Sequence, residues 1–206
     1  MSILDQLASA LGRNDEQPNI ALAEALAAKP DAAAVAELVG VLSAGTAAQK
    51  SDAIKVLYEL GERRPEAVAE HAAAFIELLT SRNNRLVWGA MHAVATVTPL
   101  RAEQVAAALP AILSAADKGS VIAKDHAMSI LARLALAGHA AALPVLLDRL
   151  GTAAPNQFPM YSEMASPAVT PAHRARFRAI LGGRLARIEQ PAKRARVEKV
   201  LNKLAH

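Results

Sequence analysis

The strongest constraint on the fold is a set of apolar stripes that repeats every 37 residues. Stripes of a first kind place apolar side chains at positions i, i+3, i+4 and i+7, and stripes of a second kind place them at i, i+3 and i+6, so that each stripe lies on one face of a helix. The stripes of the first kind are Val35–Leu42, Ala72–Leu79 and Leu109–Ala116, and those of the second kind are Ile54–Leu60, Met91–Val97 and Met128–Leu134. Two stripes that share one period indicate a repeating pair of helices.

A helix pair of this length cannot bury its apolar face alone, whereas stacked neighbours bury a continuous core. A fourth first-helix stripe, Leu143 to Leu150, follows Leu109 at a shorter offset of 34 residues. The pattern therefore predicts an all-α chain, an α-α superhelix or solenoid of about five helix pairs.

The third pair carries a resemblance to a known kind of repeat. Leu109–Asp117 reads LPAILSAAD, and after a turn Val121–Ala135 reads VIAKDHAMSILARLA. Together they resemble a HEAT repeat, and Leu143–Leu150 (LPVLLDRL) is similar to the start of another. The resemblance covers roughly residues 31–150. It implies a HEAT/armadillo-type helical-repeat protein from a bacterial, uncharacterised HEAT-like group.

One position departs from the HEAT pattern. Such repeats usually pair an aspartate after the first helix with an arginine early in the second. Asp117 and Asp148 fit the aspartate, but Ser51, Trp88 and Asp125 stand where the arginine is expected.

We expect residues 1–206 to form a single α-solenoid domain. Its predicted parts are an N-terminal cap pair (1–30), HEAT-like repeats (31–151), an irregular Pro-rich insert (152–170) and a basic C-terminal helix pair (171–206). Ser2 to Leu11 is expected to be a short amphipathic helix with Ile3, Leu7 and Leu11 inward. Pro110 is expected to kink an otherwise helical run. The insert has room for a short helix between Met160 and Ala165 at most.

Composition limits the function classes. The chain has no cysteine, which excludes disulfides and thiolate chemistry and fits a reducing compartment. The N-terminus lacks a signal-peptide pattern, and no apolar run is long enough to span a bilayer. We therefore expect a cytoplasmic protein with no membrane partner.

The net charge of +4 conceals an asymmetry. From Thr170 to the end, ten Lys or Arg face only two acidic residues, Glu189 and Glu198, a local charge of +8. The first 169 residues must therefore carry −4. The basic character belongs to the last two helices.

No catalytic constellation is recognisable. The six histidines lack metal-ligand spacing such as HExxH, and there is no glycine-rich phosphate loop or nucleophile elbow. Lys124, Asp125 and His126 are consecutive, so on a helix they point in different directions. We expect no catalytic residue, no metal and no cofactor, and the sequence favours a binding protein over an enzyme.

The candidate binding site lies on the second helices. In proteins of the kind that this chain resembles, these helices line the concave surface. Trp88, with Arg85 three residues before it and His92 four residues after it, has the pattern of a binding hot spot. Equivalent or neighbouring positions hold Lys55, Asp125 and Arg133. In the alternative interpretation, Trp88 wedges between adjacent helices and is part of the core.

Two functions follow from these features. The first is a non-enzymatic scaffold that binds a protein or peptide partner on its concave face. The second is a nucleic-acid-binding HEAT-like protein related to bacterial DNA alkylation-repair glycosylases. Its phosphate contacts would come from one side of the last helix, namely Lys193, Arg196, Lys199 and Lys203. That charged side can equally be a solvated capping face, and the acidic first 169 residues place this function second.

Overall fold

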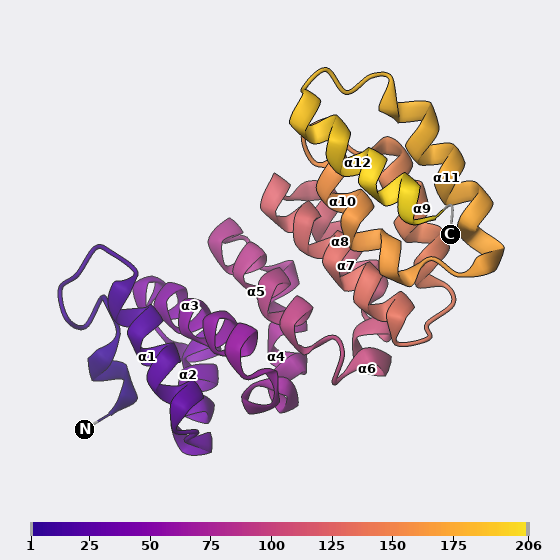
Figure 1. Ribbon diagram of the computed structural model, residues 1–206. Coiled ribbons are helices and arrows are strands. Elements are labelled where there is room, and N and C mark those ends of the chain that lie inside the picture. Colours follow the sequence, from indigo (N-terminus) through magenta and orange to yellow (C-terminus); the bar gives the residue numbers. More distant parts are fainter. Residues whose placement is uncertain (1, 205–206) are drawn as a thin grey trace. The chain divides into compact units, whose positions relative to one another are not determined.

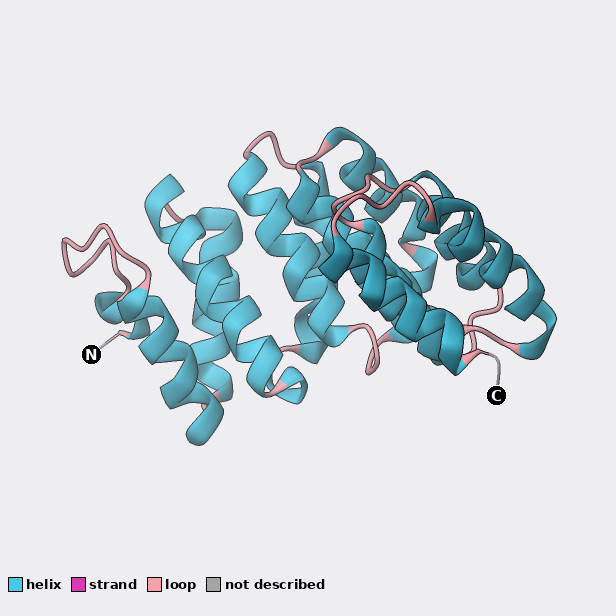
Figure 2. Cartoon of the chain, turned by 45° about the horizontal axis from the view of Figure 1, so that its top comes forward, coloured by secondary structure: helices cyan, strands magenta, loops and turns pink. Residues whose placement is uncertain are grey.

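The structure is a computed structural model that describes residues 2–204. Within these residues every regular element is helical, as predicted, and no strand occurs (Figures 1 and 2). The α-helices are α1 (Gln17–Ala28), α2 (Ala32–Ala44), α3 (Ala47–Arg63), α4 (Ala72–Glu77), α5 (Asn84–Val97), α6 (Ala102–Ala107), α7 (Leu109–Lys118), α8 (Val121–Leu136), α9 (Ala142–Thr152), α10 (Phe158–Ala165), α11 (Pro171–Leu185) and α12 (Pro191–Lys203). Short 3-10 turns lie at Ile3–Gln6, Pro65–Ala67, Ala69–His71, Leu78–Thr80 and Ser166–Ala168.

Contacts within the chain divide it into two compact units, and the boundary falls inside α8. Unit 1 comprises residues 1–127 and unit 2 comprises residues 128–206. In unit 1, α3 is the central helix, because it packs against α1, α2 and α5. In unit 2, α12 packs against α10 and α11, and α9 packs against both α10 and α11.

The predicted second-helix stripes form the centre of the core. Each of their side chains is at most 2% exposed, and they are Ile54, Leu57, Leu60, Met91, Val94, Val97, Met128, Leu131 and Leu134. Side-chain caps fix where three of the helices begin. Asp31 accepts from the Ala34 amide, Thr46 from Gln49, and Asn83 from Arg85. Each cap satisfies a helix-terminal N–H that has no partner within the helix.

Two glycines allow α3 and α5 to pack closely. A Cβ added at Gly61 of α3 would lie 2.3 Å from Thr96 Oγ1. A Cβ added at Gly89 of α5 would lie 2.9 Å from Ile54 Cγ1. Both distances are shorter than a van der Waals contact, so the spacing of these helices depends on the missing side chains.

The N-terminal segment differs from the expected amphipathic helix. Only Ile3–Gln6 is helical, as a 3-10 turn, and Leu11 is 55% exposed where an inward position was predicted. The chain then turns at Gly12, whose φ of +66° is a left-handed conformation that favours glycine. The 3-10 turn already ends at Leu7, whose backbone is extended (φ −67°, ψ 148°), so no helical stripe continues to Leu11.

A buried polar network holds the N-terminal segment in place. The buried Asn19 side chain accepts from the Ala8 amide at 3.0 Å and donates to Asp52 Oδ1 at 2.7 Å. The other oxygen of Asp52 accepts from the Ser9 amide at 2.8 Å. The segment is therefore attached to α1 and α3 by hydrogen bonds that periodicity could not indicate.

The structure differs from the predicted helix bounds at two further places, both of them near prolines. Where Pro110 was expected to kink one helix, the run separates into α6 and α7, and Pro110 lies in the first turn of α7. Proline is tolerated there because the first amides of a helix have no intrahelical partner. The expected irregular insert 152–170 contains α10, which starts at Phe158, two residues before the predicted limit. Phe158 is fully buried, so this segment contributes to the core of unit 2.

Candidate functional site

Four aromatic rings from three helices of unit 1 form a continuous stack. The Tyr58 ring of α3 stacks on His92 of α5, with centroids 4.3 Å apart and planes 19° from parallel. His92 in turn stacks on His126 of α8, at 4.3 Å and 23°. Trp88 also packs on Tyr58, tilted by 49° with centroids 6.0 Å apart. Offset and tilted ring pairs of this kind are favourable contacts.

The stack has a buried base and an accessible edge. Tyr58 is only 4% exposed, whereas Trp88, His92 and His126 are half-buried. Trp88 therefore fits neither sequence interpretation completely. Its ring packs on Tyr58, yet the residue is half-buried and not part of the fully buried core.

A chain of alternating charges runs beside these rings. The five ion pairs, in order along the chain, are Arg85–Glu16 (2.7 Å), Glu16–Lys55 (3.0 Å), Lys55–Glu59 (2.8 Å), Glu59–Arg63 (2.5 Å) and Arg63–Glu24 (3.2 Å). Three cations and three carboxylates take part, so this charge chain is neutral as a whole. It links α1 and the segment before it to α3 and α5.

Lys55 is the least exposed member of this chain, with 9% of its side chain accessible. Burial by itself lowers the pKa of Lys55, but its hydrogen bonds to Glu59 and Glu16 outweigh that effect and the pKa is raised. Burial also favours the neutral form of Glu59, yet the hydrogen bonds from Lys55 and Arg63 hold the pKa of Glu59 below its usual value. Both groups are therefore charged at neutral pH and stabilise each other.

Polar contacts fix the exposed part of the stack. Glu62 Oε1 lies 2.7 Å from His92 Nε2, which orients the imidazole ring. The Lys55 ammonium lies 4.9 Å from the Tyr58 ring centroid, and the Arg85 guanidinium lies 5.9 Å from that of Trp88. Both are within the range of cation–π attraction. We define the Trp88 ridge as Lys55, Tyr58, Arg85, Trp88, His92 and His126.

Four of the six predicted partner-binding residues meet in this ridge. Arg85, Trp88 and His92 lie together, whereas Lys55 is buried, not exposed on the same face, and holds the carboxylates in place. Asp125 is half-buried in α8, directly before His126 in the chain. Arg133 belongs to unit 2, so the structure does not place it with the others.

Sequence reasoning missed Tyr58, His126 and Glu16. Tyr58 lies three residues after Lys55, one helical turn further along the same face, and this spacing could have indicated it. His126 was not expected to take part, because its sequence neighbours point in different directions. Glu16 precedes the repeats, so no periodic signal could have connected it with Lys55.

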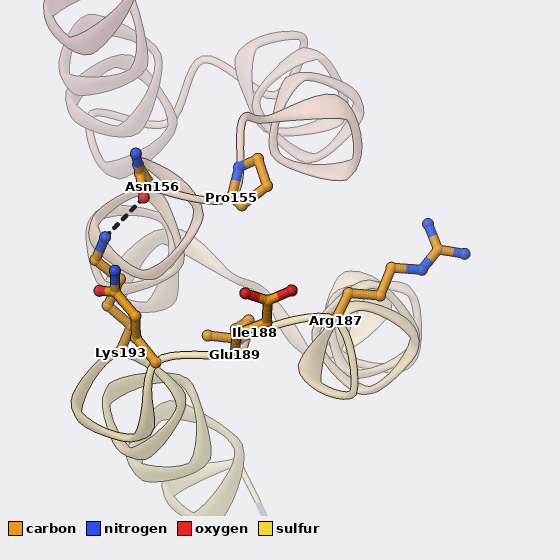
Figure 3. Close-up of a pocket in the computed structure, with 7 residues that line it drawn as sticks. Pro155, Asn156, Arg187, Ile188, Glu189 and Lys193 are labelled. Carbon is orange, nitrogen blue, oxygen red and sulfur yellow. Dashed lines mark hydrogen bonds between the residues drawn. The ribbon is translucent and has the colours of Figure 1, made fainter.

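Of the four α12 residues predicted to bind nucleic acid, two are hydrogen-bonded to neighbouring side chains and two have no ion-pair partner among residues 2–204. Lys193 Nζ donates to Asn156 Oδ1 at 2.7 Å, as Figure 3 shows. Arg196 makes a two-point pair with Glu163, at 2.9 and 2.5 Å. This pair holds the pKa of Glu163 below its usual value, with Lys199 and Lys203 adding to the effect. Within residues 2–204, Lys199 and Lys203 are exposed and have no ion-pair partner.

Another cation of unit 2 is structural. Arg184 Nη1 donates to the carbonyl of Gly151 at 2.7 Å, and Nη2 donates to that of Ala153. These carbonyls lie at the end of α9, where a helix has acceptors without intrahelical donors. The guanidinium also lies 4.5 Å from the Phe158 ring centroid, and burial lowers the pKa of Arg184.

The described part of the chain has neither a metal-binding cluster nor a membrane-spanning helix. Across residues 2–204, no three His, Asp or Glu side chains gather closely enough to hold a metal ion. None of the described helices has the length and apolar character needed to cross a lipid bilayer. A small pocket of about 210 Å³ lies between the loop before α10 and the loop before α12 (Figure 3).

Comparison with known proteins supports the fold and leaves the function open. No protein-family model matches the chain, and no curated protein matches it. Two engineered proteins with crystal structures from the Northeast Structural Genomics Consortium are similar to it, with TM-scores of 0.62 and 0.63, each at 17% identity. These matches cover 100% and 99% of this chain and 97% and 99% of theirs.

A designed armadillo repeat protein is also similar, with a TM-score of 0.60 and 15% identity over 98% of this chain and 99% of its own. At such low identity the likeness concerns the fold alone. The predicted helical-repeat solenoid fold is thus confirmed, in an armadillo-like form.

Proposed function

We propose that this chain is a non-enzymatic helical-repeat scaffold whose Trp88 ridge binds a protein or peptide partner. We place it in the HEAT-like group and propose that residues 1–206 form a single solenoid domain with the ridge on its concave face. The observation that supports this function most directly is the half-buried Trp88 side chain, held against Tyr58 and flanked by Arg85. Tryptophan and arginine are the residue types most enriched among binding hot spots.

Preorganisation supports the same proposal. His92 is held by ring stacking and by Glu62, and Arg85 is held by Glu16. Side chains that are already ordered lose little conformational entropy when a partner binds. The neutral charge chain favours a protein partner over nucleic acid at this surface, since a groove for a polyphosphate requires an excess of cations.

A peptide selection tests the proposal while the natural partner is still unidentified. Peptides are selected from a display library on the wild-type chain and are then measured against Trp88→Ala and Trp88→Phe. We expect Trp88→Ala to weaken binding by roughly 30-fold, as for a hot-spot residue worth about 2 kcal/mol. Trp88→Phe keeps a ring against Tyr58 and should have a smaller effect.

Arg82→Ala is the matched control, because Arg82 is exposed just before α5 and is outside the ridge. Circular dichroism establishes that each variant is folded. If the selected peptides bind folded Trp88→Ala as tightly as the wild type, the ridge is not the binding site.

A further inference from the structure

Unit 2 has an excess of positive charge that its own carboxylates do not balance. Residues 128–206 contain 12 Lys and Arg against 4 Asp and Glu, a net charge of +8. Residues 1–127 contain 11 Lys and Arg against 15 Asp and Glu, a net charge of −4. The boundary between the two compact units therefore also separates opposite charges.

Three of the four carboxylates in unit 2 are each paired with one arginine. The pairs are Arg176–Asp148, Arg196–Glu163 and Arg194–Glu198. The fourth carboxylate, that of Glu189, is exposed and makes no ion pair within residues 2–204. At most one further cation can therefore be neutralised inside the unit.

The unbalanced cations lie along the helical hairpin of α11 and α12. Arg178, in the middle of α11, donates from Nη1 to the carbonyl of Leu204 at 3.3 Å, so this part of α11 lies beside the end of α12. Arg174 precedes Arg178 by one helical turn, and Lys199 precedes Lys203 by one turn. These side chains place four cations at one end of the hairpin, and all are exposed.

The other end of the hairpin carries Arg187 and Lys193, which line the small pocket. Figure 3 shows the guanidinium of Arg187 extended away from the hydrogen bond between Lys193 and Asn156. We define the cationic hairpin by the side chains at both ends, namely Arg174, Arg178, Arg187, Lys193, Lys199 and Lys203.

The composition of this surface decides among three kinds of anionic partner. A lipid surface would require apolar side chains that insert among the lipids. The large apolar side chains exposed in the described structure all lie outside the hairpin, at Leu11, Leu100, Val121, Ile122 and Leu136. Protein interfaces also need an apolar or aromatic centre. A nucleic-acid backbone needs only cations and hydrogen-bond donors.

The hairpin has no tyrosine or tryptophan, and its one phenylalanine, Phe177, is fully buried. Its one histidine, His173, is half-buried, with Nδ1 2.9 Å from the Thr170 hydroxyl. Proteins that bind single strands usually stack the bases on exposed aromatic rings, which this surface lacks. A duplex keeps its bases stacked internally and offers only its backbone to such a surface. The chemistry of the hairpin therefore fits a duplex better than a single strand.

We propose that the cationic hairpin binds the phosphate backbone of duplex nucleic acid without reading its sequence. From Lys193 to Lys203 the helix spans about 15 Å, at about 1.5 Å per residue. That length corresponds to about four phosphates of one strand, at about 3.4 Å each along the duplex axis. The hairpin shares no residue with the Trp88 ridge, so either proposal can fail without the other.

The test is fluorescence anisotropy of a labelled mixed-sequence duplex with the full chain over a range of salt concentrations. If four to six phosphates are contacted, log K should fall with log salt at a slope between about −3.6 and −5.4. The double variant Lys199→Gln/Lys203→Gln should reduce the magnitude of that slope by about 1.8. Duplexes of different sequence should bind alike.

The matched control is Lys118→Gln/Lys124→Gln, which removes two exposed cations from unit 1. We expect this control to leave the slope unchanged, because those cations lie outside the hairpin. Equal losses in the two double variants would mean that only total charge matters and would overturn the proposal. No binding at low salt would overturn it too, as would displacement of the duplex by polyglutamate or anionic vesicles at equal charge concentration.

Discussion

The two units use lysine and arginine in opposite ways. In unit 1, Lys55, Arg63 and Arg85 alternate with carboxylates in one neutral chain, and Lys55 is almost completely buried. In unit 2, cations outnumber carboxylates threefold, 12 to 4, and those of the cationic hairpin remain largely unpaired. The same residue types therefore form internal ion pairs in unit 1, whereas in unit 2 they create a positive potential that attracts external anions.

The units also differ in how their glycines are used. In unit 1, Gly61 and Gly89 lie where α3 and α5 approach too closely for a Cβ. In unit 2, Gly182 in α11 is exposed, and a Cβ added there would meet nothing within 4 Å. Close packing thus requires glycine at these two positions of unit 1, whereas the exposed position 182 of unit 2 has room for a side chain.

The largest expected effect comes from adding one methyl group at these positions. Gly61→Ala and Gly89→Ala should each lower the free energy of unfolding by about 1–3 kcal/mol, because Thr96 and Ile54 must move. Gly182→Ala should instead raise it by up to about 1 kcal/mol, since alanine favours a helix and the space is open. Urea denaturation measures all three variants. If all three variants changed the free energy of unfolding equally, the glycines of unit 1 would not be packed more tightly than Gly182 of unit 2.

The next effect tests the charge chain. Lys55→Met keeps much of the side-chain volume but leaves Glu16 and Glu59 without their shared cation. We expect a loss of about 1–2 kcal/mol in the free energy of unfolding, because two partly buried carboxylates each lose one of their two cationic partners. Lys199→Met, on the exposed hairpin, should change it by less than about 0.5 kcal/mol. If Lys55→Met leaves the free energy of unfolding unchanged, the chain of ion pairs contributes nothing to stability.

The smallest effect is the dependence on pH. The pKa of Glu59 in the folded state lies below its ordinary value of 4.5, because Lys55 and Arg63 outweigh the opposing effect of burial. Its ionised form therefore stabilises folding above that pH, and this stabilisation is lost as the pH falls through the lowered pKa. Glu59→Gln should destabilise the chain at neutral pH and have no effect in strong acid.

Glu163→Gln in unit 2 provides the comparison. The pKa of Glu163 is also lowered, mainly by Arg196, but its side chain is 42% exposed and solvent screens the pair. We expect its effect at neutral pH to be below about 1 kcal/mol and smaller than that of Glu59→Gln. Unfolding free energies at neutral and acidic pH measure both, and the reverse order would contradict the contrast between the units.

The periodic part of the fold could be predicted from the sequence, because burial leaves a regular trace. Ile54, Met91 and Met128 recur at the predicted offset and are all buried. Contacts made by residues outside the period leave no such trace. The attachment of Asn19 to Asp52 and the burial of Phe158 both depend on tertiary partners that a local pattern does not encode.

The candidate site could be predicted in part for the same reason. The spacing of Arg85, Trp88 and His92 indicated one helical face, and the structure places them together. It could not indicate that Lys55 is buried, because that depends on two carboxylates from different parts of the chain. A helical wheel gives the direction of a side chain, but burial is decided by the neighbours.

Arg184 has a consequence for the modularity of the chain. Repeat proteins are often shortened or extended by whole helix pairs, as if the pairs were interchangeable building blocks. Here the end of α9 relies on a guanidinium that comes from α11, more than 30 residues later. A chain cut before α11 would lose the donor for two carbonyls and uncover the Phe158 ring. Any redesign that replaces the last hairpin must therefore supply an equivalent arginine.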